Sequence, residues 1–68
     1  MTFAEKVQEV RGLLRLTQMQ LAAELEVAFT TINRWEKGRN EPQFLERRKF
    51  DDFCKMHGIT FDGTEGGE

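Results

Sequence analysis

Two short amphipathic patterns lie within residues 17–38 and are separated by only a few residues. Thr17, followed three residues later by Gln20, is typical of a capping box, which starts a helix. Apolar residues then recur on one helical face, at Leu21, Ala22 and Leu25. A turn at residues 26–27 leads to a second pattern that begins near Ala28. The sequence therefore predicts two helices joined by a tight turn, and the rest of the chain has to pack around that pair.

The second predicted helix, residues 29–37, has two chemically different faces. At about 100° per residue, its inner face carries Ala28, Ile32, Trp35 and Glu36. Its outer face carries Thr30, Asn33, Arg34 and Lys37. These outer groups match base edges and phosphates, with arginine suited to guanine and asparagine to adenine. A solvated surface would also be polar, so the pattern alone leaves both interpretations open.

The order of residues along this stretch resembles the Cro and phage-repressor type of helix-turn-helix, the XRE family. The resemblance covers about residues 3–57 without an insertion and is carried by Arg11, Gln18, Leu21, Ala22, Val27, Ile32, Trp35, Glu36, Gly38 and Pro42. It implies an all-α fold, a compact four- to five-helix bundle of the lambda-repressor type. It also implies a sequence-specific transcriptional regulator, typically a repressor, that inserts helix 29–37 into the major groove of double-stranded DNA.

The resemblance also assigns roles to single residues. Thr30, Asn33 and Arg34 would contact bases, whereas Gln18, Lys37 and Arg39 would hold the DNA backbone. Arg11 would pair with Glu36 and so tie the first helix to the end of the third. Two independent surface charges are the alternative for that pair. For Lys37 and Arg39 the alternative is a solvated loop.

The chain departs from the family pattern at three positions. Glu26 stands where the family usually has glycine, at a left-handed helix end. Ala28 stands where a capping Ser or Thr is common. Phe29 replaces a glutamine that often buttresses the equivalent of Gln18, so Gln18 is expected to lack that partner but still to reach a phosphate. Phe29 itself is expected either to fill the core or an interface, or to contact a thymine methyl group or sugar.

Helical spacing predicts two further helices that supply most of the core. The first begins at Thr2, and Gly12 within it is interpreted as a point of close helix approach. Its apolar stripe is Phe3, Val7, Val10 and Leu14. The last runs over about residues 44–57, ends at Gly58, and carries Phe50, Phe53, Cys54 and His57 as core residues. A fifth short turn is allowed around Ile59 and Phe61.

These patterns divide the 68 residues into a helix-turn-helix domain at residues 1–58 and a flexible, acidic, glycine-rich tail at residues 59–68. The formal net charge is −2, which argues against strong non-specific DNA binding. The charge is unevenly distributed, however. Eight basic and five acidic residues from position 11 to position 49 give +3, and three acidic residues after Gly58 give −3. The basic run at residues 47–49 is expected to be a solvated helix face or a DNA-backbone contact.

Several classes of function are not supported by the sequence. Cys54 is the single cysteine, so an intrachain disulfide is excluded. Cys54 and His57 together supply only two of the four ligands that a structural zinc ion needs. No catalytic constellation, cofactor motif, small-molecule site, signal peptide or membrane span is evident, and a cytoplasmic, non-enzymatic protein is expected. A helix-turn-helix scaffold that mainly binds protein, as an antitoxin-like partner or an accessory to a DNA-modifying enzyme, is the alternative. A homodimer is expected, formed either in solution or only on DNA.

Overall fold

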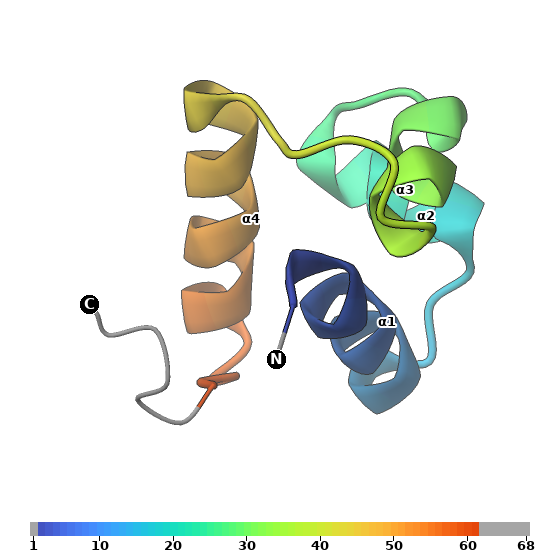
Figure 1. The fold of residues 1–68 in the computed structure, drawn as a ribbon. Helices are drawn as coiled ribbons and strands as arrows, with labels where there is room; N and C mark the ends of the chain where they lie inside the picture. The colour runs from blue at the N-terminus through green and yellow to red at the C-terminus, as the bar shows by residue number, and fades with distance from the viewer. Residues whose placement is uncertain (1, 62–68) are drawn as a thin grey trace.

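The computed structural model describes residues 2–61, which form four α-helices and contain no strand. They are α1 (Phe3–Leu14), α2 (Gln18–Leu25), α3 (Phe29–Glu36) and α4 (Phe44–Met56). Figure 1 shows α2 and α3 side by side, α1 beneath them and α4 across a shared interior. The predicted all-α fold is confirmed. Within residues 2–61, no helix combines the length and the apolar character needed to cross a membrane.

Local side-chain hydrogen bonds explain where α1 and α2 begin. The Thr2 hydroxyl accepts from the Glu5 amide at 3.2 Å, and the Glu5 carboxylate accepts from the Thr2 amide at 2.9 Å. Thr17 and Gln20 form the same reciprocal pair at 3.0 and 2.9 Å. Both capping boxes satisfy amides that have no partner within the helix. At the start of α3, Ala28 provides no side-chain cap, as its methyl group requires.

Two helices end in a left-handed residue that is not glycine. Arg15 follows α1 with φ 57°, and Glu26 follows α2 with φ 59°. The Glu26 amide donates back to the carbonyls of Ala22 and Ala23, which closes the turn before α3. A side chain in this conformation costs about 1 kcal/mol relative to glycine. The tight α2–α3 turn therefore forms despite the missing glycine.

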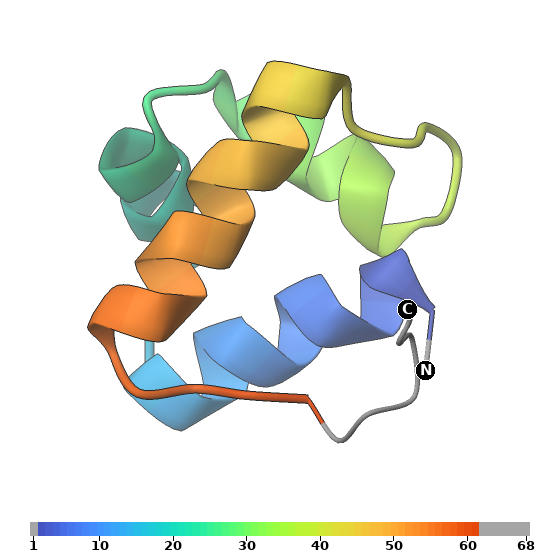
Figure 2. The ribbon, with the colours of Figure 1, turned by 90° about the vertical axis from the view of Figure 1, so that its left-hand side faces the viewer.

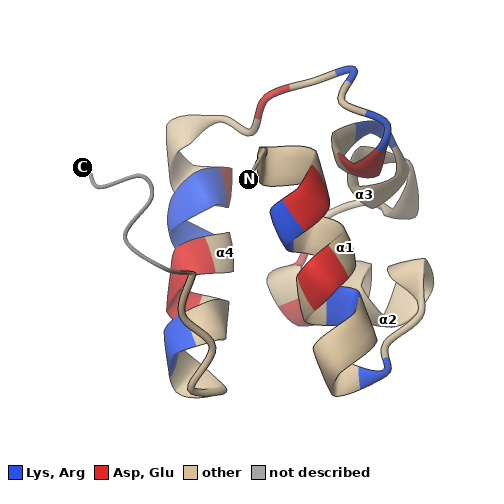
Figure 3. Ribbon diagram, turned by 60° about the horizontal axis from the view of Figure 1, so that its bottom comes forward, with Lys and Arg blue, Asp and Glu red and all other residues tan. Residues whose placement is uncertain are grey.

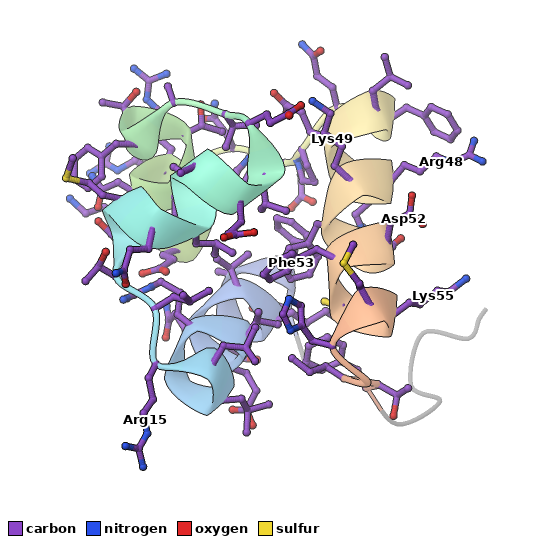
Figure 4. The ribbon with its side chains drawn as sticks, turned by 180° about the vertical axis from the view of Figure 1, so that it is seen from behind. Arg15, Arg48, Lys49, Asp52, Phe53 and Lys55 are labelled. Carbon is purple, nitrogen blue, oxygen red and sulfur yellow. The ribbon has the colours of Figure 1, made fainter. Side chains whose placement is uncertain are left out.

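The core lies where all four helices meet. Phe3 packs edge-to-face against Trp35 and Phe50, with ring centroids 5.3 and 5.1 Å apart. Figure 4 shows Phe53 pointing from α4 into the space between the helices, whereas Arg48 and Lys55 point away from it. The buried apolar residues are Phe3, Val7, Val10, Leu21, Ala22, Leu25, Ile32, Trp35, Phe50, Phe53 and Cys54. Leu14, also expected in the core, is partly buried at its edge.

His57 and Gly12 differ from the sequence-based expectations. His57 is exposed because it follows the last turn of α4, at φ −98° and ψ 9°, where helical spacing no longer sets its direction. Its ring rests against Phe53 at a centroid distance of 4.5 Å. Gly12 lies on the exposed side of α1, and a Cβ added there would meet no atom within 4 Å. The interpretation of Gly12 as a point of close helix approach is therefore wrong.

The packed part of the chain continues beyond α4. No helical turn forms at residues 59–61, so the optional fifth helix is absent from the described part of the chain. Ile59 and Phe61 instead pack against the core as the segment returns along α1 (Figure 2). The Phe61 ring lies 5.5 Å from the Lys6 ammonium, a cation–π distance. Residues 59 and 61 of the predicted tail therefore contact the core, and its acidic residues 62–68 lie outside the described residues.

Candidate nucleic-acid interface

The inner face of α3 is held in the core. Ile32 and Trp35 are both almost completely inaccessible to solvent. They lie three residues apart, so their side chains project from the same side of the helix. Burial of this one face fixes the rotation of α3 about its axis. The opposite face must therefore point outward.

The outer face of α3 and the following loop present the polar residues expected to contact DNA. Thr30, Arg34, Lys37 and Arg39 are exposed, and Asn33 is partly buried. Within residues 2–61, the three cations make no side-chain hydrogen bond or ion pair. Figure 3 shows basic segments where α3 runs into the loop that leads to α4. These charges are available to an external anion.

Phe29 opens α3 and is 46% exposed. It lies outside the buried core cluster, so it does not fill the core. An interface role and a DNA contact both remain open. The exposed Met19 of α2 is a second large apolar residue on the helix-turn-helix. The start of α3 is consequently the apolar end of an otherwise polar surface.

An ion pair links α1 to the end of α3. The Arg11 guanidinium donates from Nε to Glu36 Oε2 and, at 3.0 Å, from a terminal nitrogen to Oε1. The Glu36 side chain is 8% exposed and that of Arg11 28%. The hydrogen bond to Glu36 is the main cause of a raised pKa of Arg11, burial opposes it, and the Glu36 charge adds to it. Arg11 therefore remains charged, and the expected pairing is present.

Gln18, at the start of α2, joins the same network. Its side-chain nitrogen donates to Glu36 Oε1 at 3.0 Å and lies 3.5 Å from Asn33 Oδ1. From the sequence alone, Gln18 is expected to lack a partner because Phe29 occupies the usual buttressing position. The structure supplies different partners further along α3. Since an amide nitrogen carries only two hydrogens, neither remains for a phosphate in this arrangement.

Gln8 makes a contact with the end of α3 that the sequence did not reveal. Its side-chain nitrogen donates to the backbone carbonyl of Glu36 at 3.0 Å, at the end of α3. Gln8 precedes Arg11 by three residues, so both side chains lie on one side of α1. The three-residue spacing of Gln8 and Arg11 is the sequence signal from which this contact could have been predicted. Two α1 residues, rather than one, hold the C-terminal end of α3.

The basic run at residues 47–49 does not form one charged face. Arg47 lies with its guanidinium 5.2 Å from the Phe3 ring centroid and pairs with Asp51 at 3.7 Å. Lys49 lies 3.7 Å from Glu26, across the gap between α4 and α2. Arg48 is exposed and points away from the body of the protein (Figure 4). Only part of this run is therefore available to a partner.

The described residues contain no group of three or more His, Cys, Asp or Glu side chains that could hold a metal ion. Cys54 is a buried free thiol. Burial is the main cause that raises its pKa to about 11, with a smaller contribution from Asp51 and an opposing one from Lys6. A protonated thiol inside the core is a packing group. It contributes no chemistry to the α3 surface.

Comparison with known proteins gives two matches. A helix-turn-helix family model matches residues 7–46, more than half of the chain, from α1 to the start of α4. The chain is also 40% identical, over all of its 68 residues, to the HTH-type transcriptional activator BcrR of Enterococcus faecalis. It spans only 32% of that protein's length. A search of solved structures found no significant match.

Proposed function

Since this chain belongs to the XRE-type helix-turn-helix family, we propose that it is the DNA-binding domain of a transcription regulator and inserts α3 into the major groove. The observation that carries the proposal is the contrast between the two faces of α3. One face is buried at Ile32 and Trp35, and the other presents Arg34 and Lys37, which have no ion-pair or side-chain hydrogen-bond partner among residues 2–61. Unpaired cations beside exposed hydrogen-bonding groups suit a phosphate backbone and the base edges between its strands.

The proposed contacts follow from position along α3. Thr30, Asn33 and Arg34 face base edges, and Phe29 meets a thymine methyl group or sugar at the start of the helix. Lys37 and Arg39, at the end of α3 and in the loop, contact phosphates. Gln18 is left out of the phosphate contacts because both hydrogens of its amide are already directed at α3.

The proposal covers DNA binding and regulation, not the direction of regulation. The relative is named a transcriptional activator, so the repression expected from the resemblance is not carried forward. The relative is also about three times as long as this chain, as its 32% coverage shows. Any activity of the remaining two thirds belongs to that protein.

Arg34 provides the most direct test, because a guanidinium can donate twice to guanine O6 and N7. Arg34→Ala is expected to weaken binding to the preferred site by about 1 to 3 kcal/mol and to relax discrimination at one base pair. Binding to random duplex DNA and the free energy of unfolding should change little, since Arg34 is exposed. Binding-site selection followed by affinity measurements on the selected and random duplexes checks this.

Arg39→Ala is the matched control. Because Arg39 is proposed to contact a phosphate, Arg39→Ala should weaken binding to specific and random duplexes alike. It should also reduce the salt dependence of binding by about one unit of slope. If Arg34→Ala behaved in the same way as Arg39→Ala, Arg34 would be a phosphate contact. Base reading would then be assigned to Thr30 and Asn33.

A protein-binding scaffold is the second candidate, and the exposed pair Phe44 and Leu45 at the start of α4 favours it. The two candidates differ in their response to salt. A DNA-binding domain should lose affinity for random duplex steeply as salt rises, because each phosphate contact releases counterions. A domain used only for protein contacts should bind random duplex too weakly to show such a slope.

A further inference from the structure

Four polar side chains from three helices form one continuous network beneath the outer face of α3. Arg11 comes from α1, Gln18 from α2, and Asn33 and Glu36 from α3. Arg11 donates twice to the Glu36 carboxylate, and Gln18 donates to Glu36 Oε1 at 3.0 Å. The same Gln18 nitrogen faces Asn33 Oδ1 at 3.5 Å. Asn33 is thus the only member of the network that belongs to the proposed DNA-contacting set.

The charge of Glu36 fixes the orientation of the two amides. An ionised carboxylate accepts hydrogen bonds but cannot donate one. Gln18 must therefore turn its nitrogen, not its oxygen, toward Glu36. The second hydrogen of that nitrogen then faces Asn33, and the favourable partner for it is the Asn33 oxygen. Reversing the Asn33 amide would set two donors against each other.

We propose that Gln18 is a positioning residue for DNA recognition, which holds the Asn33 oxygen toward α2 and leaves the Asn33 NH2 group to donate to a base. The inference rests on the proposed function and assigns a polarity to one contact within it. In the major groove, guanine, adenine and thymine each offer an acceptor, whereas cytosine offers only the N4 amino donor. Asn33 therefore disfavours cytosine at the base it contacts. The Arg11–Glu36 pair thus affects the base preference indirectly, because Glu36 orients Gln18, although neither charged residue touches a base.

The experiment is binding-site selection from randomised duplexes with the 68-residue protein and its variants. Asn33→Ala first identifies the base pair that Asn33 reads, as the pair whose preference it flattens. Gln18→Met keeps the side-chain length but removes both donors. It is expected to reduce discrimination at that same pair by about fivefold or more, the low end of the range for a base contact. The base preference attributed to Arg34 should stay unchanged.

Gln8→Met is the matched control, because Gln8 donates to the Glu36 backbone carbonyl and not to Asn33. Because Gln8 contacts only the end of α3, its loss should not selectively reduce discrimination at the base pair that Asn33 reads. Thermal unfolding of each variant checks that it is folded, and Gln18→Ala replaces Gln18→Met if the longer side chain prevents folding. A loss of affinity that is equal at all positions in the Gln18 variant would overturn the proposal, because it would make Gln18 a phosphate contact.

Asn33→Asp tests the polarity itself. The aspartate can still accept from Gln18, but it offers the DNA an acceptor in place of a donor. Cytosine should then be enriched at the position from which the unmodified protein excludes it. Enrichment of cytosine by the unmodified protein would refute the assigned polarity while leaving the proposed function intact. Absence of any preferred site and of salt-dependent DNA binding would refute the proposed function instead.

Discussion

Glu36 links α3 to both α1 and α2. Its carboxylate accepts from Arg11 and Gln18, and its backbone carbonyl accepts from Gln8. These contacts come from α1 and α2, so one acidic side chain ties three helices together. Removing one partner of a partly buried pair leaves the other charge uncompensated, which costs more than the intact pair contributes.

Replacing Arg11 by methionine should therefore lower the free energy of unfolding by about 1 to 3 kcal/mol. Adding Glu36→Gln should recover part of that loss, because the uncompensated charge is removed. Urea unfolding of both single variants and the double variant gives the coupling energy. Arg15→Met is the control, since Arg15 points into solvent (Figure 4) and should change stability little. A coupling energy near zero would show that Arg11 and Glu36 act independently.

The raised pKa of the buried Cys54 thiol leads us to expect a loss of stability at alkaline pH. Its pKa is about 11 in the folded protein against an ordinary value of 9.0, mainly because of burial. Above about pH 9 the thiol ionises in the unfolded chain but not in the folded one. The contribution of the protonated thiol to the free energy of unfolding is therefore complete below pH 9 and is lost as the pH rises toward 11. By pH 11 the loss should be about 2 kcal/mol relative to Cys54→Ala, which lacks the titrating group. Chemical unfolding of both proteins across this range checks the difference, and parallel pH profiles would contradict it.

At the scale of elements, the helices are defined by local signals that agree with the tertiary packing. The two capping boxes start α1 and α2, and the left-handed residues Arg15 and Glu26 end them. The α2–α3 connection is less well supported, because Glu26 replaces a glycine and Ala28 cannot cap. Burial of Ile32 and Trp35 offsets these local costs. Packing of α3 against the core, rather than local preference, thus stabilises this connection.

Gly12 offers a test of local helix preference without a change in packing. Gly12→Ala should raise the free energy of unfolding by about 1 kcal/mol, because alanine restricts the unfolded chain more than glycine does and its methyl group meets open space. Gly38→Ala is the matched control. It adds the same methyl group, also into open space, but at φ +72°, and should be destabilising. Thermal unfolding separates the two, and a destabilising Gly12→Ala would point to a contact made by Gly12 outside the described residues.

At the scale of the whole molecule, one chain is too small to read a two-fold site. The chain measures 28 × 23 × 19 Å along its principal axes, and among residues 2–61 only α3 is proposed to read DNA. Paired recognition helices in this class of DNA-binding motif lie about 34 Å apart. If α3 reads DNA as proposed, two copies would be needed to place α3 in successive major grooves on one face of the duplex. The exposed Phe44 and Leu45 are available for contact between copies.

The enriched DNA site is accordingly expected to be an inverted repeat that binds two chains. Native mass measurement on the selected duplex should give two proteins per duplex. A duplex that holds a single half-site is the control, and it should bind one protein with lower affinity. Sites without an inverted repeat, together with one protein per duplex, would contradict a homodimer on DNA.

Much of the fold was predictable from the sequence because it depends on local chemistry and spacing. Thr17 and Gln20 mark a helix start by their own hydrogen bonds, and the spacing of Ile32 and Trp35 identifies the buried face of α3. The outer face of α3 follows from that, since a helix with one buried side must expose the other. His57 was misplaced because helical spacing stops applying at the last turn of α4.

Contacts between distant residues were decided only by the tertiary structure. Gln18 reaches Glu36 and Asn33 because α2 crosses α3 at a particular angle, and no spacing within either helix encodes that angle. Ile59 and Phe61 join the core because the segment after α4 returns along α1, although the residues beside them resemble a tail. The sequence by itself thus determined which groups each helix presents. The tertiary structure decided which of those groups meet, because hydrogen bonds and packing between elements depend on positions that only the assembled core defines.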